Sequence, residues 1–464
     1  MAESDIEKIT DAEETVIDVK KTEMIDMTEG SPMRLLIKFA IPLLVGNLFQ
    51  QLYNLVDSVI VGKLVGANAL AAVGASGSIS FLFFALCNGI GSGGGIITSQ
   101  MFGRKDVKKV KRCIANTAYI MLLFSVVVGT VAFFLAKPLL ILLDTPSDII
   151  ADSIAYLRVM CLGIIFVALY NFSSSMLRSL GDSITPLIFL IASTILNGVL
   201  DFIFVYFFKM GVLGAAVATM IAQFISGIGC LIYATKSNPF FKLSKEDMKY
   251  DKPICESIVK IGVPLSLQFS LIAISTMALQ RVVNSFGSVT VAAFTAISRI
   301  EQVIHQPYQT LSASLSTYTG QNYGASNKKR ILKGYHTGMV IMVIFTVLML
   351  PVMQLFGDNI MRIFVNDAEV IAMGAKAIRI SSLFYVFLGM IYTIRGVLNG
   401  LSDSFFAMLN GIVEVVGRFT VPIGLTAIAS IGVWGIWWSV GVVWFLSGFT
   451  AWLRYLYKIK RLEI

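Results

Sequence analysis

Apolar runs long enough to cross a membrane recur along nearly the whole chain, from Phe39 to Leu456. A spanning helix needs about 20 mostly apolar residues. The strands of a membrane barrel would instead show about ten residues of strict alternation, and these runs are continuous. With 56% hydrophobic and 14% charged residues, the chain has more apolar surface than a soluble core can hide. The sequence therefore predicts an all-α integral membrane protein with the lipid bilayer as its partner.

Glycine, proline and charged clusters divide these runs into about twelve predicted transmembrane helices. We expect them near residues 35–62, 70–100, 111–136, 152–177, 183–208, 211–235, 257–284, 291–320, 331–356, 370–398, 405–428 and 432–457.

The two halves of the chain repeat at a constant offset of 221 residues. The matching pairs include Thr98 with Thr319, Gln100 with Gln321, Gly103 with Gly324, Leu180 with Leu401, Asp182 with Asp403, Gly211 with Gly432, and Gly214 with Gly435. Because each half holds an even number of helices, a pseudo-two-fold axis along the membrane normal should relate them. We expect two six-helix lobes, an N-lobe at 31–235 and a C-lobe at 257–457, joined by a cytoplasmic linker at 236–256.

The charged residues predict the orientation in the membrane. Basic residues cluster at 104–112, 236–260 and 328–333, all in loops that lie on one side of the predicted helices. By the positive-inside rule, both termini of this multi-pass protein should be cytoplasmic, with the helices in the cell membrane. Residues 1–30 carry ten acids against three lysines and should form a disordered cytoplasmic tail. Residues 458–464 form a basic C-terminal tail.

Polar side chains in the first predicted helix share one face. They are Asn47, Gln50, Gln51, Asn54 and Asp57, at three- and four-residue intervals. A carboxylate exposed to lipid costs several kcal/mol, so Asp57 should face protein or water. The alternative is that Asp57 lies in the headgroup region, where an aspartate costs little. Asn47, Gln51 and Asn54 are candidates for lining a substrate cavity.

The fifth and sixth predicted helices add polar residues at the same spacing. Asn197 and Asp201 are four residues apart, and Thr219 follows in the next helix. Together with Asp57 they offer oxygen ligands suited to Na⁺, or a proton site. We expect cation or proton coupling at Asp57, Asn197, Asp201 and Thr219, with Na⁺ as a possible metal at the first three. Asn197 and Thr219 could instead serve as interhelical hydrogen bonds. No other cofactor is expected.

The C-lobe cannot duplicate this site, because Arg418 and Pro422 stand at the positions that match Asn197 and Asp201. Glu301 and His305 in the eighth helix are further candidates for a substrate cavity. Glu414 lies four residues before Arg418, and this spacing predicts that the two side chains neutralise each other.

Several segments of the chain together have the order and spacing of one known family. They are Ile41-Pro42, Asn54-Leu55-Val56-Asp57, Ala71-Ala72-Val73-Gly74, Gln100-Met101-Phe102-Gly103, Arg178-Ser179-Leu180-Gly181-Asp182-Ser183, and Asn197 to Asp201 followed by Gly211 and Gly214. This resemblance, which spans residues 31–457, is to the multidrug and toxic compound extrusion (MATE) family of efflux transporters. It implies two six-helix lobes forming a V. It also implies export of cationic or amphipathic drugs, driven by inward flow of H⁺ or Na⁺, with coupling at Asp57, Asn197, Asp201 and Thr219.

The resemblance also implies a transporter rather than an enzyme. We expect a monomer that binds small molecules and no nucleic acid, since the predicted cleft lies within one chain. Three alternatives stay open. A lipid or lipid-linked sugar flippase of similar architecture should line its cavity with cations, whereas the candidates here are mainly acids and amides. An intramembrane aspartyl protease needs two catalytic aspartates in helices. A channel would show flux that does not saturate with substrate.

Overall fold

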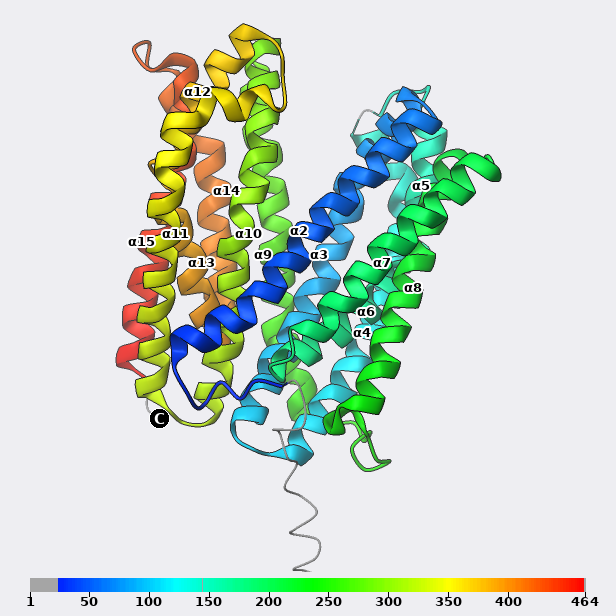
Figure 1. Ribbon diagram of the computed structural model, residues 1–464, viewed down its shortest axis with the longest axis vertical. Helices are drawn as coiled ribbons and strands as arrows, with labels where there is room; N and C mark the ends of the chain where they lie inside the picture. Colours follow the sequence, from blue (N-terminus) through cyan, green and yellow to red (C-terminus); the bar gives the residue numbers. More distant parts are fainter. Residues whose placement is uncertain (1–23, 144, 463–464) are drawn as a thin grey trace, which may run out of the picture.

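The structure, a computed structural model, describes residues 24–143 and 145–462. Figure 1 shows two helical bundles that meet at one end and splay apart at the other, so that the molecule forms a V. The first bundle holds α2 (Pro32–Leu64), α3 (Ala67–Gly103), α4 (Val107–Leu142), α5 (Ile150–Leu162), α6 (Ile164–Ser179), α7 (Ile184–Phe202) with the π-helical turn η2 (Ile203–Phe207), and α8 (Gly211–Ser237). The second holds α9 (Lys252–Asn284), α10 (Ser288–Gly324), α11 (Lys328–Arg362), α12 (Ala368–Ser382), α13 (Tyr385–Gly400), α14 (Ser404–Thr426) and α15 (Gly435–Lys460).

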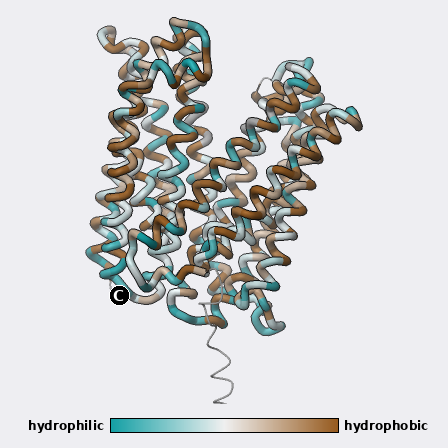
Figure 2. Tube along the Cα trace, viewed as in Figure 1, coloured by the Kyte–Doolittle hydropathy of each residue, from teal (hydrophilic) through white to brown (hydrophobic). Residues whose placement is uncertain are grey.

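Length and hydropathy identify up to eleven membrane spans among the described helices, against about twelve expected. Nine of them are long and apolar enough to cross a membrane, and two bent pairs each make one more span. The 37-residue α10, more polar than the others, completes the expected twelve. Figure 2 shows that hydrophobic residues cover the helices, while hydrophilic residues gather at both ends of the molecule.

Two spans that the sequence predicts as continuous helices are broken. The span expected at 152–177 bends by 44° between α5 and α6, and the span expected at 370–398 bends by 51° between α12 and α13. The breaks fall at Gly163 and Phe384, which match at the 221-residue offset. A Cβ on Gly163 would lie 1.6 Å from Met220 Sδ, and a Cβ on Gly441 would lie 2.3 Å from the Phe384 ring. The glycine and its bulky neighbour have therefore changed places between the two halves, so that a neighbouring helix packs tightly against each bend.

The repeat also sets where helices begin. Asp106 caps α4 by accepting a hydrogen bond from the Lys109 backbone N–H over 3.0 Å. Asn327, its counterpart, caps α11 by accepting from the Arg330 backbone N–H over 3.1 Å. A side-chain oxygen at this position satisfies one of the free N–H groups in the first helical turn. Both caps lie at the end where the bundles meet, beside the basic loops (Figure 1).

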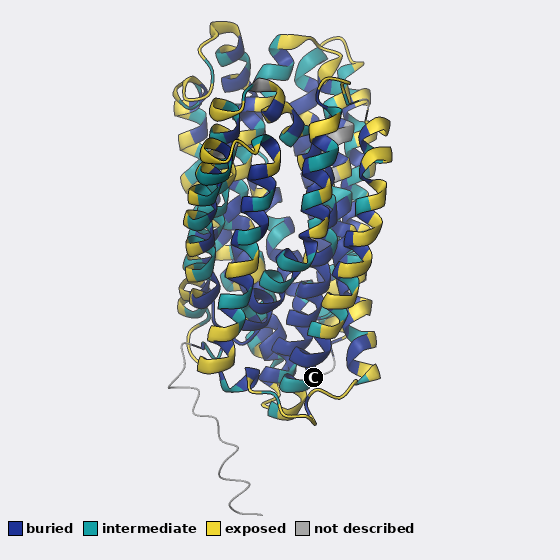
Figure 3. Ribbon diagram, turned by 90° about the vertical axis from the view of Figure 1, so that its right-hand side faces the viewer, coloured by how far each residue is buried: buried dark blue, intermediate teal, exposed yellow. Residues whose placement is uncertain are grey.

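Helix α3 packs against α9 and α10 of the other bundle, and the contacts that α3 and α10 make across the junction repeat about the pseudo-two-fold axis. Gln100 Nε2 donates to the Gly400 carbonyl over 2.8 Å, and Gln321 Nε2 donates to the Ser179 carbonyl over 3.1 Å. A Cβ on Gly103 would lie 1.8 Å from the Gln321 carbonyl oxygen. A Cβ on Gly324 would lie 1.9 Å from the Gln100 carbonyl oxygen. Figure 3 shows buried residues concentrated at this end.

Substitution of Gly103 should therefore destabilise the junction of the lobes. We expect Gly103→Ala to lower the free energy of unfolding by about 1–3 kcal/mol, because the added methyl meets backbone that cannot rotate away. Gly74→Ala in the same helix is the matched control, since a Cβ there meets nothing within 4 Å. Thermal unfolding of the purified protein in detergent measures both. Equal midpoints for the two variants would contradict the close approach.

Helix α2 belongs to both lobes. Leu36, Phe39 and Leu43 near its start pack in the hydrophobic core of the C-lobe, whereas its later turns lie against α7. Figure 1 shows α2 beginning in front of the second bundle and rising into the first. The expected N-lobe, residues 31–235, therefore begins with a segment that packs against the other lobe. Residues 24–30, which the sequence assigns to the acidic tail, are packed at the same end; the rest of that tail lies outside the described residues.

Candidate functional site

Asp57 and Asp201 meet near the splayed end of the N-lobe. Asp57 lies in the last turns of α2, and Asp201 lies at the end of α7. The two carboxyl groups are in hydrogen-bonding contact. Asp201 is fully buried and Asp57 is half-buried. The structure places the Asp57 carboxyl against a second carboxyl, and the depth of Asp57 in the membrane stays a prediction.

Asn197 and Thr219 complete the group that the sequence predicts. The Asn197 amide, oriented with its nitrogen toward the carboxylate, donates to Asp201 Oδ2 over 2.8 Å and accepts from the Thr219 backbone N–H over 3.1 Å. Both residues are buried. The four coupling candidates from three different helices therefore lie together.

The backbone is irregular directly beside this group. Helix α7 ends at Phe202 and continues as the π-helical turn η2, which contains Val205 as a buried residue. Short π-helical segments often occur at functional sites, because they change the direction of neighbouring side chains. Asp201 therefore lies at a change of helix type, one residue before α7 ends.

The arrangement restricts the charge that the two carboxyl groups can carry. Two carboxylates in contact cannot both stay ionised unless a cation lies between them, so a proton or a metal ion must accompany the pair. Asp57 Oδ1 and Asp201 Oδ1 are buried with no hydrogen-bond partner among the described residues. These two acceptors could receive a proton donor or a cation. The Asn197 amide fits here in two orientations: its nitrogen donates to Asp201 Oδ2, or its oxygen faces Asp201 while its nitrogen donates to Thr219 Oγ1 over 3.3 Å. The first orientation suits a proton on the carboxyl pair, and the second adds an oxygen ligand suited to Na⁺.

Tyr53 is part of this group and was missed by sequence reasoning. Its hydroxyl lies 3.1 Å from Thr219 Oγ1, in hydrogen-bonding contact. Tyr53 stands four residues before Asp57, the same spacing that joins Asn197 to Asp201, so the periodicity contained the signal. A tyrosine in an apolar run is usually interpreted as lipid-facing. The polar face of this helix was defined by amides and acids alone, so it left Tyr53 out.

Replacing Tyr53 should weaken the site without abolishing it. We expect Tyr53→Phe to shift the ion dependence of transport by about 2- to 10-fold, since it removes one hydrogen bond and keeps the ring. Tyr119→Phe is the matched control, because the Tyr119 hydroxyl donates to the Met248 carbonyl at the opposite end of the lobe. The measurement is initial transport rate against the concentration of the coupling ion. Indistinguishable curves for Tyr53→Phe and Tyr119→Phe would exclude a role for the Tyr53 hydroxyl.

A pocket of about 520 Å³ lies beside this group, between α2 and α7. Tyr53 and Asn197 are its polar lining residues next to Thr194, and most of the remaining lining is aliphatic or aromatic, including Val56 and Phe202. Such a volume accommodates a small organic molecule. A ligand here would touch two side chains that also contact Thr219.

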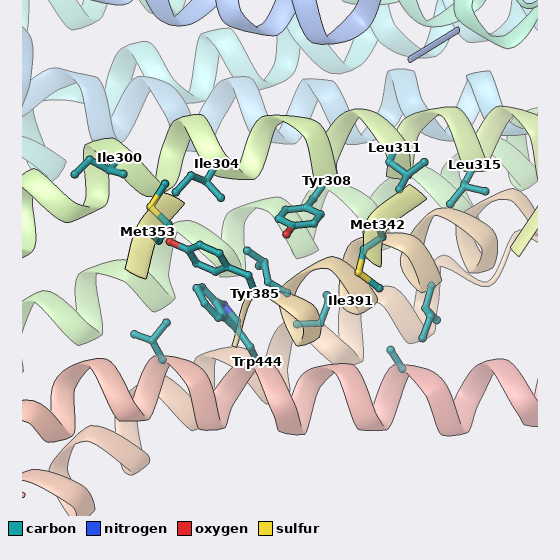
Figure 4. Close-up of a cluster of buried hydrophobic side chains, with 14 of the residues drawn as sticks. Ile300, Ile304, Tyr308, Leu311, Leu315, Met342, Met353, Tyr385, Ile391 and Trp444 are labelled. Atoms are coloured by element: carbon teal, nitrogen blue, oxygen red, sulfur yellow. The ribbon is translucent and has the colours of Figure 1, made fainter. Parts of the chain in front are cut away.

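The other substrate-cavity candidates lie apart from this group. Asn47 Nδ2 donates to Thr310 Oγ1 of α10 over 3.3 Å, so it ties α2 to the C-lobe. Gln51 is half-buried and Asn54 is exposed on α2. Glu301 and His305 lie inside the C-lobe, where the His305 ring makes edge contacts with Tyr392 and Trp444. Figure 4 shows the neighbouring core of this lobe, in which Tyr308, Tyr385 and Trp444 pack among aliphatic side chains.

The buried charges of the C-lobe pair differently from the expectation. Glu414 forms an ion pair with Arg395 of α13, not with Arg418. The geometric reason is that the two acceptors of Arg395, Asn410 and Glu414, lie one turn apart on the same face of α14. Arg418 interacts electrostatically with Glu414 without forming an ion pair, and it also interacts with Glu301. Glu301 is therefore a partly compensated acid.

The comparisons with known proteins agree with this architecture. The family model MatE matches residues 42–203 and 264–431, one segment in each lobe. The chain belongs to the MATE family.

Curated MATE relatives match it nearly end to end. The probable multidrug resistance protein YpnP of Bacillus subtilis is 33% identical over 437 residues, which are 93% of this chain and 96% of YpnP. The multidrug export protein MepA of Staphylococcus saprophyticus is 25% identical over 424 residues, 91% of this chain and 93% of MepA. Among solved structures, a MOP superfamily transporter from Pyrococcus furiosus has a TM-score of 0.87 at 21% identity, covering 95% of this chain and 98% of that one. An outward-facing MATE transporter has a TM-score of 0.85 at 22% identity, covering 96% and 99%.

The resemblance, the fold class and the absence of enzymatic function are thereby confirmed, since MATE proteins are membrane transporters. Asp182, which belongs to one of the segments that resemble the family, has a structural role at the start of α7. Its carboxylate accepts from the backbone N–H groups of Ile184 and Thr185, each over 3.0 Å, so it caps α7.

Proposed function

We propose that this MATE protein is a proton-coupled antiporter that exports cationic or amphipathic drugs by alternating access. The observation that carries the proposal is the contact between Asp57 of α2 and Asp201 of α7 inside the N-lobe. Drug export is supported by the names of the curated relatives, which are multidrug resistance and export proteins. The V shape, joined at one end and splayed at the other, supports a carrier that opens at one face at a time (Figure 1).

The proposed cycle begins with a proton entering from the splayed end. The proton neutralises one carboxylate of the Asp57–Asp201 pair, which removes the repulsion between the two groups and lets α2 and α7 pack closely. Deprotonation to the other side of the membrane restores the negative charge, which attracts a cationic substrate into the neighbouring pocket. The membrane potential supplies about 2.3 kcal/mol per charge per 100 mV, enough to bias a two-state switch more than tenfold.

The orientation of the Asn197 amide is the reason for proposing a proton rather than Na⁺ as the coupling ion. With its amide nitrogen toward Asp201, the side chain donates to the carboxylate and occupies the place that an oxygen ligand for Na⁺ would need. Thr219 and Tyr53 hold that amide and its helix in position. Asp57, Asn197 and Asp201 would hold Na⁺ only after the Asn197 amide rotates.

The proposal includes the orientation and the oligomeric state. Both described ends of the chain lie at the end where the bundles meet, together with the basic clusters at 104–112 and 328–333. By the positive-inside rule, this end lies on the cytoplasmic side of the cell membrane. The coupling residues all come from one chain, which supports a functional monomer.

Efflux of ethidium, a fluorescent cation, from proteoliposomes tests the proposal. We expect a pH gradient to drive ethidium out. A Na⁺ gradient of equal size at fixed pH should leave the efflux rate at the value measured without any ion gradient. Efflux driven only by Na⁺ would overturn the proton assignment. Saturation with ethidium separates a carrier from a channel. Movement of fluorescent phospholipid without ethidium efflux would favour the flippase alternative.

A further inference from the structure

Residues 24–30 form a segment between the two lobes, at the end where they meet. We call this segment the N-terminal latch. Met27 is fully buried and Met24 is 8% exposed, although the latch belongs to the acidic stretch that composition assigns to solvent. Figure 1 shows the latch crossing the lower part of the molecule before it turns up into α2.

The latch is bonded to the N-lobe at its start. The Ile25 backbone N–H donates to the Gly181 carbonyl over 3.3 Å, in the turn between α6 and α7. Asn238 Nδ2, after the end of α8, donates to Met24 Sδ over 3.3 Å. Met24 also packs in the hydrophobic cluster of the N-lobe.

Its second half is bonded to the C-lobe. The Met27 backbone N–H donates to Gln321 Oε1 over 2.8 Å, and its carbonyl accepts from Asn322 Nδ2 over 3.0 Å. Arg330 reaches the latch with two nitrogens, Nη2 to the Met27 carbonyl and Nη1 to the Gly30 carbonyl, each over 2.9 Å. Met27 packs in the hydrophobic core of the C-lobe. Seven residues therefore bridge both lobes with directed backbone bonds.

The internal repeat is broken where the latch lies. Gly181 has a φ of 89°, and its counterpart Ser402 has a φ of 60°, so the same left-handed turn occurs in both lobes. Ser402 carries a side chain, which accepts a hydrogen bond from Gln100 Nε2 over 2.8 Å. At Gly181 a Cβ would lie 2.2 Å from the Ile25 carbonyl oxygen. The turn itself therefore tolerates serine, and the latch occupies the space that a side chain would take.

We propose that the latch is a conformation-selective clasp, which stabilises the state closed at the end where the lobes meet. This inference rests on the proposed alternation between two openings. To open this end, the lobes must separate, and the latch cannot then keep both Gly181 and Gln321 as partners. Its hydrogen bonds and the burial of Met27 therefore stabilise only the closed state. Their loss shifts the population toward the state that is open at this end.

Distances between spin labels across each end of the molecule test this clasp. Lys108→Cys and Lys329→Cys are exposed and match at the 221-residue offset, so they report on the latched end. Asp148→Cys and Glu369→Cys match in the same way and report on the splayed end. The five native cysteines are buried, so the spin label reacts with the introduced, exposed cysteines. The proteins compared are the full chain, Δ2–23, Δ2–30, Gly181→Ser, and Gly181→Ser within Δ2–30.

We expect Δ2–30 and Gly181→Ser each to raise the ratio of open to closed molecules at the latched end by about tenfold, as loss of a few hydrogen bonds predicts. Δ2–23 should behave as the full chain. Gly181→Ser should add nothing within Δ2–30, because its clash partner is gone. This lack of additivity separates the clasp from a general loss of stability.

Two results would overturn the inference in different ways. If the full chain switches with pH or substrate but Δ2–30 has the same distances as Δ2–23, the latch does not select a conformation, and alternating access stands. If the latched end never opens in any variant or condition, the proposed alternation fails, and the clasp fails with it.

Discussion

Asp201→Asn should abolish the increase in ethidium efflux that a pH gradient produces. Asparagine is permanently neutral and nearly isosteric, so the variant keeps the packing of the fully buried Asp201 side chain but cannot cycle between charged and neutral forms. Asp57 then faces an amide rather than a second carboxyl. Uncoupled exchange of substrate down its own gradient should persist, because the pocket between α2 and α7 is intact.

Asp152→Asn is the matched control for this substitution. Asp152 is an exposed carboxylate in the first turn of α5, in the same lobe. It should retain full pH-driven efflux. If Asp201→Asn transported as well as Asp152→Asn, the carboxyl pair would not be the coupling site, whatever the family.

Glu414→Gln should lower the free energy of unfolding by about 3–5 kcal/mol, the largest stability effect expected in the chain. The Arg395 and Glu414 side chains are each 6% exposed, and Arg395 also donates to Asn410 Oδ1 over 2.8 Å. Removing one member of a buried ion pair leaves the other charge without compensation. Unfolding in mixed micelles of increasing denaturing detergent measures the difference.

Two comparisons make this test specific. Arg395→Met combined with Glu414→Gln should recover most of the lost stability, because neither charge then remains buried. Asp358→Asn disrupts the Arg379–Asp358 pair, whose side chains are 40% and 44% exposed, and should cost less than about 1 kcal/mol. A double variant no more stable than Glu414→Gln would show that the pair has another role.

The periodicities of the sequence predicted the parts of the site that lie on single helices. Asn197 and Asp201 share a helical face, and Asp57 ends a polar face of α2, so their inward direction followed from spacing. The 221-residue offset predicted that Gln100 and Gln321 would occupy equivalent places, and their hydrogen bonds do so. These features depend on local geometry and on symmetry, which a sequence records directly.

Pairings between helices could not be read in the same way. Arg395 stands alone in an apolar run, and the nearest acid by helical spacing was assigned to Arg418, four residues from Glu414. The choice between the two arginines depends on how α13 packs against α14. The bends at Gly163 and Phe384 likewise depend on a partner in another helix. In the N-lobe the glycine lies at the bend, whereas in the C-lobe the glycine lies on the neighbouring helix.

The average composition of the first thirty residues did not predict the latch. Ten acids in the first thirty residues outweigh Met24 and Met27, although these two methionines, three residues apart, are the side chains that pack. A short buried segment needs only one or two apolar contacts when backbone hydrogen bonds hold the rest.

Proton movement driven by substrate tests coupled export most directly. Proteoliposomes loaded with a pH-sensitive dye and held without any pH gradient would receive ethidium outside, and the internal pH would be followed. Because coupling is reciprocal, inward movement of ethidium should drive protons out and raise the internal pH in the parent and in Asp152→Asn, but not in Asp57→Asn or Asp201→Asn. Entry of ethidium into parent proteoliposomes with no change in internal pH would contradict a proton-coupled antiporter.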